Sequence, residues 1–204
     1  MKIINAGYEI LDMPERKDIL ELIEKIGRVC YKSEDRITPE SAGQFVSMII
    51  KSGHESVLEH ATVSVKFICD RGVSHEIVRH RIASYSQEST RYCNYSKDKF
   101  GGEITVIRPF FWDEESELYR IWKNSAEEAE RSYFDLLKSG ATPEQARSVL
   151  PNSLKTELCT TMNLRQWRHF FKLRTSEKSH PQMREIAVAL QEELREILPE
   201  IFVR

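Results

Sequence analysis

The segment "EIVRHRIASYSQESTRY", residues 76–92, concentrates side chains that can bind an anion. It holds three arginines and a histidine together with three serines and a threonine. Arginine guanidinium groups and hydroxyl groups both donate hydrogen bonds to phosphate oxygens. Such a segment suits a solvated helix face, a strip that binds nucleic acid, or a pocket for a phosphorylated small molecule.

The overall charge of the chain narrows these alternatives. The 204 residues contain 30 Lys and Arg and 32 Asp and Glu, which gives a net charge of -2. Proteins that bind duplex nucleic acid are usually strongly basic. Any anion-binding role must therefore come from a local cluster of cations.

The two halves of this segment predict different local structures. If Val73–Ile82 is helical, Arg79 and Arg81 point about 200° apart around the helix axis and face different surroundings. The part that follows is rich in serine and lacks the alternation of a plain strand, so we expect a loop. Its hydroxyls and backbone amides, with Arg91, are suited to phosphate oxygens.

The segment "HESVLEH", residues 54–60, contains two histidines and two glutamates, as a metal site would. The histidines are six residues apart, about 240° around a helix, whereas a helical zinc pair needs a spacing of four. We therefore expect no metal here. The segment is either a polar turn or a turn that presents His54 and Ser56 to a pocket.

A third cationic cluster is "NLRQWRHFFKLR", residues 163–174. On a helix starting at Asn163, with Gln166 completing a capping box, Arg165, His169 and Lys172 share one side. Arg174 comes near the C-terminal end, where a cation is favoured. An ordinary amphipathic helix explains this pattern equally well, and Arg147 in "QARSVLP" is more often solvated than functional.

The elements that must position these clusters alternate without a strict β-α-β order, and no glycine-rich phosphate loop is present. We expect strands at residues 1–7, 62–69, 103–109 and 154–162. We expect helices at residues 14–30, 39–53, 73–82, 113–139, 142–151, 163–173 and from 181 onward. This order favours one α+β domain over residues 1–204, with a largely antiparallel or mixed sheet flanked by helices.

The cellular setting follows from what is missing in the sequence. The N-terminus lacks the apolar core of a signal peptide, and no apolar run approaches the roughly 20 residues that span a bilayer. The four cysteines are scattered without a CxxC pair. We expect a cytoplasmic protein with free thiols and no structural zinc.

Taken together, the clusters resemble a known family. Arg79, His80 and Arg81 are followed by seven residues and then Ser89, which is similar to the signature of the flavin-dependent thymidylate synthases. The segments "GHESVLEH", "SHEIVRHR", "SYSQESTRY", "QARSVLP" and "NLRQWRHFFKLR" occur in the order of that family and at its spacing. The resemblance covers residues 53–174 strongly and the two ends loosely.

The resemblance implies an α+β homotetramer with active sites at subunit interfaces, each binding FAD and dUMP. It implies that dUMP becomes dTMP, with methylene-tetrahydrofolate as one-carbon donor and NADPH as reductant. The FAD site would comprise Ser56, Arg79, His80, Arg81, Gln87, Asn163, Arg165 and His169. The dUMP site would comprise Glu76, Arg79, Gln87, Glu88, Ser89, Thr90, Arg91, Arg147 and Arg174. The catalytic residues would be Arg174 against the uracil ring, Ser89, and His54 near folate and flavin.

Two other functions compete with this interpretation. The arginine clusters also suit a nucleotide-binding or nucleic-acid-binding protein without catalysis, which the balanced charge disfavours. A metal-dependent nucleotide hydrolase would use His54, Glu59 and His60.

Overall fold

The computed structural model describes residues 1–97 and 100–203, and the chain divides into two compact units. Unit 1 comprises Met1–Gly7, Phe67–Arg79 and Ser86–Cys159. Unit 2 comprises Tyr8–Lys66, His80–Tyr85 and Thr160–Arg204. The chain therefore passes between the units several times.

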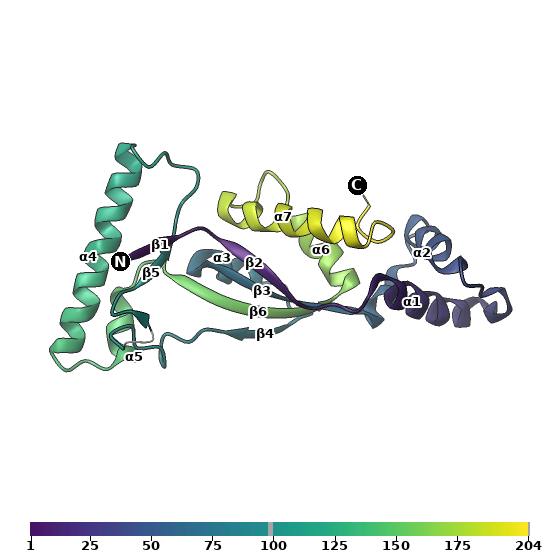
Figure 1. The fold of residues 1–204 in the computed structure, drawn as a ribbon, viewed down its shortest axis with the longest axis horizontal. Helices are drawn as coiled ribbons and strands as arrows, with labels where there is room; N and C mark the ends of the chain where they lie inside the picture. The colour runs from purple at the N-terminus through teal and green to yellow at the C-terminus, as the bar shows by residue number, and fades with distance from the viewer. Residues whose placement is uncertain (98–99, 204) are drawn as a thin grey trace. The chain divides into compact units, whose positions relative to one another are not determined.

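Helices and strands alternate irregularly along the chain, as Figure 1 shows. The strands are β1 (Lys2–Ile4), β2 (Gly7–Asp12), β3 (Thr62–Asp70), β4 (Ser84–Gln87), β5 (Thr105–Ile107) and β6 (Lys155–Asn163). The α-helices are α1 (Arg16–Tyr31), α2 (Ser41–Lys51), α3 (Arg71–Ile77), α4 (Glu117–Lys138), α5 (Pro143–Ala146), α6 (Leu164–Arg174) and α7 (Pro181–Ile197). Short 3-10 helices are η1 (Glu34–Arg36), η2 (Glu55–His60) and η4 (Arg147–Val149).

The strands form two sheets. One has four strands in the order β2-β3-β6-β4, and the other joins β1 and β5 in parallel, with Ile3 opposite Val106. The expectation of an α+β fold with a mainly antiparallel, mixed sheet and flanking helices is confirmed. The alternating burial of β6 follows from its sequence, because every second side chain of a strand lies on the same face.

The core of unit 1 forms between α4 and the two-stranded sheet. Ala126 and Tyr133 of α4 pack with Val106 of β5 in one buried cluster, and Figure 1 shows α4 running beside β1 and β5. The rings of Tyr95 and Tyr133 lie 5.7 Å apart. This packing gives the loop that follows β4 a rigid neighbour on one side.

The core of unit 2 is built on α6. Its residues Trp167, Phe170 and Phe171 are almost completely buried, and α6 packs against η2 and α7. The indole Nε1–H of Trp167 donates to the carbonyl oxygen of Val63 at 3.1 Å, so α6 is also tied to β3. The helix therefore presents its remaining side chains from a fixed position.

Three sequence expectations are wrong in their details. The predicted helix 73–82 starts and ends earlier, since α3 covers Arg71–Ile77. The residues Arg79, His80 and Arg81 are therefore not helical, so no helix sets Arg79 and Arg81 about 200° apart. The physical reason is local: the Tyr85 hydroxyl donates to the His80 carbonyl oxygen at 2.6 Å, which holds the chain in a turn instead of a helix.

The second correction concerns the predicted loop, whose first part is the strand β4. This strand is the last in the sheet order, and its residues alternate between exposed and half-buried.

The third correction concerns α2, which begins at Ser41 and not at Pro39. The Ser41 hydroxyl accepts from the Thr38 backbone N–H at 2.9 Å, so residues 38–41 form a turn before the helix.

Candidate active site

Each unit contains one cluster of the residues that the sequence singles out. Unit 1 holds all the predicted dUMP residues except Arg174. Unit 2 holds Arg174, His54 and all the predicted FAD residues except Arg79 and Gln87.

His80 is the centre of the cluster in unit 2. Its ring is almost completely buried, with 5% of the residue exposed. The Nε–H of Arg174 donates to His80 Nε2 at 3.0 Å. On the other side of the ring, the Gln166 side-chain amide lies 3.2 Å from Nδ1. Both ring nitrogens are therefore engaged by side chains of α6.

The spacing on α6 explains why these side chains meet one ring. Gln166, Phe170 and Arg174 follow each other at intervals of four residues, so they form one stripe along the helix. Phe170 packs against the His80 ring with centroids 5.0 Å apart. The start of α6 is fixed by an N-cap, because the Asn163 side chain accepts from the Gln166 backbone N–H at 2.8 Å. The predicted cap at Asn163 is confirmed.

The surroundings of His80 disfavour its charged form. Burial, and then the nearby charges of Arg174 and His169, lower the pKa of His80 from 6.5 to about 4. The ring is consequently neutral near pH 7. Burial raises the pKa of Tyr85, whose hydroxyl donates to the His80 carbonyl oxygen, and the nearby charge of Arg174 partly offsets this rise.

A pocket of about 830 Å³ in unit 2 opens beside this cluster. Its lining includes three predicted FAD residues, Asn163, Arg165 and His169, and also Lys172, which shares their side of α6. Two ion pairs cross its wall: Arg165 lies 2.5 Å from Glu59, and Arg168 lies 2.9 Å from Glu55. Cations and an amide are donors that suit the pyrophosphate of a dinucleotide such as FAD, so these residues fit that group.

The predicted residues of the segment 54–60 lie on and next to η2. His54 stacks on Tyr31 with ring centroids 6.2 Å apart, and the Tyr31 hydroxyl is hydrogen-bonded to His54 Nδ1. Both His54 and Ser56 are exposed. Glu55 and Glu59 of the same short helix line the pocket, whereas His54 and Ser56 are not among its lining residues.

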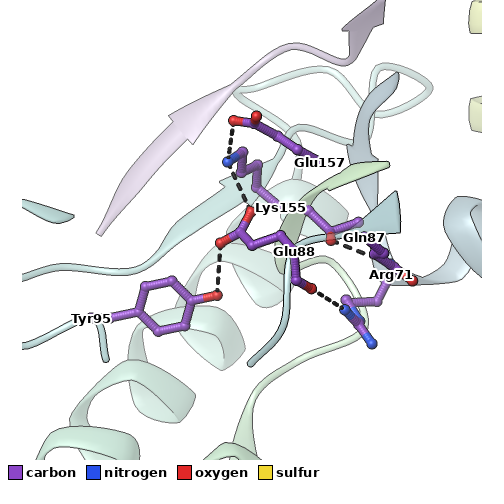
Figure 2. Close-up of polar contacts among 7 residues, drawn as sticks. Arg71, Gln87, Glu88, Tyr95, Lys155 and Glu157 are labelled. Carbon is purple, nitrogen blue, oxygen red and sulfur yellow. Dashed lines mark hydrogen bonds and ion pairs between the residues drawn. The ribbon is translucent and has the colours of Figure 1, made fainter. Parts of the chain in front are cut away.

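In unit 1, Glu88 is held from several sides, as Figure 2 shows. Lys155 Nζ lies 3.0 Å from the Glu88 carboxylate and 2.7 Å from that of Glu157. The Tyr95 hydroxyl donates to the other Glu88 oxygen at 3.3 Å. Burial alone would lower the pKa of Lys155, but the two carboxylates raise it above its usual value. Lys155 is thus a permanent cation in this network.

Backbone contacts fix Glu88 as well. Its N–H donates to the Glu157 carbonyl at 2.9 Å, and its own carbonyl accepts from Arg71 at 3.5 Å. The preceding residue, Gln87, donates its side-chain amide to Ser74 at 2.9 Å and to Thr156 at 3.3 Å. The loop that starts at Glu88 is therefore anchored at its first residue.

The rest of this loop contacts α5 and η4. Arg147 donates to the Thr90 hydroxyl at 3.2 Å, and Arg91 forms an ion pair with Glu144 at 2.9 Å. The Ser89 hydroxyl accepts from the Arg91 backbone N–H at 3.3 Å. Five predicted dUMP residues, Glu88, Ser89, Thr90, Arg91 and Arg147, thus lie together. Glu76 is on α3 and the exposed Arg79 follows it.

Sequence reasoning missed Lys155, Glu157 and Tyr95, which surround Glu88, and the contact between Gln166 and His80. One signal was available: Lys155 and Glu157 are two apart on a strand and so share a face. No local pattern indicates that they meet Glu88, which lies 67 residues from Lys155.

Two features are absent from the described part of the chain. Within residues 1–97 and 100–203, no three His, Cys, Asp or Glu side chains are grouped as a metal ion would require. In the same part of the chain, no helix has both the length and the hydropathy needed to cross a membrane.

Comparisons with known proteins identify the family of the chain. The family model described as "Thymidylate synthase complementing protein" matches residues 11–200. The flavin-dependent thymidylate synthase of Pyrococcus abyssi is 37% identical over 174 residues, which are 82% of this chain and 70% of that protein. The enzyme of the same name from Thermococcus onnurineus is 36% identical over 205 residues, covering 94% of this chain and 83% of the relative.

A solved structure gives the same architecture. The UMP/dUMP methylase PolB from Streptomyces cacaoi, bound with 5-Br dUMP, has a TM-score of 0.81 and 23% identity, and the match covers 99% of this chain and 95% of PolB. At that identity the likeness establishes the α+β fold. The family match and the curated relatives go further: the chain belongs to the thymidylate synthase complementing protein family, and the resemblance to the flavin-dependent thymidylate synthases is confirmed.

Proposed function

We propose that this protein is a flavin-dependent thymidylate synthase, a methyltransferase that converts dUMP to dTMP. The observation that carries the proposal is the 36–37% identity to proteins of that name over 82–94% of the chain. Methylene-tetrahydrofolate donates the one-carbon unit, NADPH supplies the reducing equivalents, and the folate leaves as tetrahydrofolate.

The cluster in unit 1 holds dUMP in this proposal. A nucleotide monophosphate needs hydroxyls, backbone amides and guanidinium groups, which Ser89, Thr90 and Arg91 offer. Glu88, anchored by Lys155, keeps the start of this loop in place. Arg147, which already contacts Thr90, closes on the nucleotide. Glu76, Arg79 and Gln87 complete the set.

The cluster in unit 2 holds FAD. The pocket lined by Asn163, Arg165 and His169 supports this assignment, because its donors suit a pyrophosphate. Ser56, Arg79, His80, Arg81 and Gln87 are the other flavin residues carried over from the family. When bound, the flavin supplies the redox chemistry, and the protein positions and polarises the reactants.

Arg174 is the main catalytic residue of the proposal. Its guanidinium lies against the uracil ring and stabilises the negative charge that develops there during the transfer. Ser89 and His54 are the other catalytic residues, with His54 near the folate and flavin. The two clusters supply guanidinium and hydroxyl groups, which can donate hydrogen bonds to the negative charge that develops on the pyrimidine.

The protein acts as a single domain over residues 1–204, in a homotetramer with its sites at subunit interfaces. The match of one family model to residues 11–200 supports a single functional domain. The free thiols of Cys30, Cys69 and Cys159 are compatible with the reducing cytoplasm. Its ligands are small molecules, and neither nucleic acid nor a membrane takes part.

The visible spectrum of the purified protein tests the flavin half of the proposal. Oxidised flavin absorbs at about 450 nm, so the protein should be yellow, or take up FAD stoichiometrically. Adding dUMP should change the shape of this band, because a nucleotide bound in the same active site would alter the surroundings of the flavin. Colourless protein that takes up neither FAD nor dUMP would exclude the proposal.

A binding protein without catalysis is the second candidate, since the arginine clusters alone fit it. It predicts affinity for oligonucleotides that falls steeply with salt. Oligonucleotide titrations at about 50 mM and 200 mM salt separate the two candidates. The synthase should show no such salt-sensitive binding.

A further inference from the structure

We propose that His80 is a positioning residue: its uncharged ring accepts the Arg174 Nε–H and orients the guanidinium, while Gln166 fixes the tautomer that makes this possible. The inference rests on the proposed function, in which Arg174 acts on the pyrimidine. In addition to contacting the flavin, His80 would orient Arg174. Gln166, which is not among the expected site residues, would fix the protonation of the His80 ring.

The direction of the hydrogen bonds follows from the donors. Arginine has five N–H groups and no acceptor, so Arg174 must donate and His80 Nε2 must accept at 3.0 Å. An accepting nitrogen carries no proton. A neutral imidazole has one proton, which must then be on Nδ1. The contact with Arg174 therefore requires the tautomer of His80 that carries its proton on Nδ1.

The proton on Nδ1 needs an acceptor because the ring is buried. Gln166 is also buried, with 7% exposed, and the nitrogen of its side-chain amide, Nε2, lies 3.2 Å from His80 Nδ1. A half-turn of the amide about its last side-chain bond exchanges Nε2 with Oε1. If Gln166 Nε2 donated to Nδ1 while Arg174 donated to His80 Nε2, a neutral ring could carry its proton on neither nitrogen. The amide therefore presents its Oε1 to Nδ1. In this arrangement Gln166 accepts from Nδ1–H, and a continuous chain runs from Gln166 through His80 to Arg174.

This chain orients Arg174 because the guanidinium is planar. Fixing Nε–H fixes the plane of the group, while the contact uses none of its four Nη–H donors. Arg174 is the last residue of α6, where a helix is least rigid. The His80 ring is rigid by contrast, since it packs on Phe170 at 5.0 Å and Tyr85 holds its carbonyl at 2.6 Å. A fixed ring thus anchors a side chain at a helix end.

The electrostatics support the geometry. A protonated ring would lose its acceptor at Nε2 and would repel Arg174. The surroundings, burial first and then Arg174 and His169, lower the pKa of His80 to about 4. Near pH 7 the ring therefore remains an acceptor. The sequence had indicated Gln166 as part of a capping box, but its side chain lies against His80 instead.

The tautomer can be measured without any catalysis. Histidine-selective nitrogen-15 labelling of the holoenzyme, with His80→Gln to assign the resonances, reports the protonation of each ring nitrogen at pH 7. We expect a protonated Nδ1 and an unprotonated Nε2. A ring protonated on Nε2, or on both nitrogens, would overturn the proposal even in an active enzyme.

Kinetics test whether the contact orients Arg174. His80→Leu removes the acceptor, whereas His80→Gln places a carbonyl oxygen near the position of Nε2. We expect kcat to fall about 10- to 100-fold in His80→Leu, with most of the loss recovered in His80→Gln. The exposed His75→Gln serves as a control and should leave kcat unchanged.

Flavin content and dUMP affinity distinguish positioning from folding. The affinity for dUMP should remain within about threefold of the wild type in His80→Gln, and kcat is expressed per bound FAD so that a lost flavin contact does not count as lost positioning. Equal loss of kcat in His80→Leu and His80→Gln, with folded protein in both, would overturn the positioning role. If the wild type makes no dTMP, the proposed function fails, whereas the tautomer measurement still tests the Gln166–His80–Arg174 chain.

Discussion

Lys155, the first residue of β6, donates to the carboxylate of Glu88 at 3.0 Å, although the two residues are 67 positions apart. Both side chains are mostly shielded from solvent, with 19% and 14% exposed. This contact, drawn in Figure 2, attaches the loop of predicted dUMP residues to the sheet. It adds a side-chain contact to the backbone hydrogen bond that already joins Glu88 to Glu157.

Replacing Lys155 by methionine should weaken dUMP binding about tenfold and destabilise the fold by about 1–3 kcal/mol. The reason is that Glu88 would keep a half-buried charge without its cation. Calorimetric titration with dUMP and urea unfolding measure the two effects. Lys138→Met, which breaks an exposed pair with Asp135, is the matched control and should change stability by less than about 0.5 kcal/mol. An unchanged dUMP affinity in Lys155→Met would refute the anchoring role.

Replacing Glu144 by glutamine should tighten dUMP binding. Glu144 pairs with Arg91 at 2.9 Å and would therefore compete with the phosphate of dUMP for this guanidinium. Because the pair is exposed, we expect a gain of only about two- to fivefold in Kd, which decreases as salt screens the pair. The titration is made at low and high salt. Weaker binding in Glu144→Gln would show that Glu144 supports Arg91 instead of competing with the ligand.

Stability should depend on pH through His80. Its pKa is about 4 in the folded chain and 6.5 when exposed. Between these values the unfolded chain binds a proton that the folded chain does not, so the free energy of unfolding falls as the pH drops through this window. Urea unfolding from pH 7.5 to 4.5 measures it.

The control for this pH dependence is His80→Gln, since other carboxylates and histidines titrate over the same range. The difference between the wild-type and variant curves isolates His80, together with its charged neighbours Arg174 and His169. We expect this difference to change progressively below pH 6.5. Parallel curves would mean that the pKa of His80 is the same in the folded and the unfolded chain, so that burial does not lower it.

Replacing Arg174 by alanine should lower turnover about 10²- to 10³-fold, because the group that stabilises charge on the pyrimidine is lost. Arg174→Lys should recover little, since an ammonium cannot reproduce the planar fork. Arg184→Ala, at an exposed arginine of α7, should remain within about twofold of the wild type. Loss of flavin and of folded protein in Arg174→Ala would instead assign Arg174 a mainly structural role.

Local patterns predicted much of this fold. The alternating strand at residues 154–162 and the helix beginning after Asn163 are present within one residue. These features depend on the periodicity of apolar side chains and on the capping residue, which can both be read from a short stretch of sequence. The ordered motifs likewise predicted the family.

What sequence could not predict depends on contacts between distant residues. The hydroxyl of Tyr85 bonds to the His80 carbonyl, so the expected helix ends before Arg79. The sequence suggests that the Gln166 side chain caps its own helix. In the structure this side chain instead contacts His80, which is 86 residues away in sequence. A serine-rich segment became the strand β4 because β6 offers it a pairing edge. Tertiary contacts outweighed local preference in each case.

The most direct test of the central claim is the release of tritium from dUMP labelled at ring carbon 5. The purified protein is supplied with FAD, methylene-tetrahydrofolate and NADPH, and dTMP is identified as the product. We predict release that depends on all three and matches the dTMP formed. Flavin-loaded, dUMP-binding protein that releases no tritium and forms no dTMP would contradict the account.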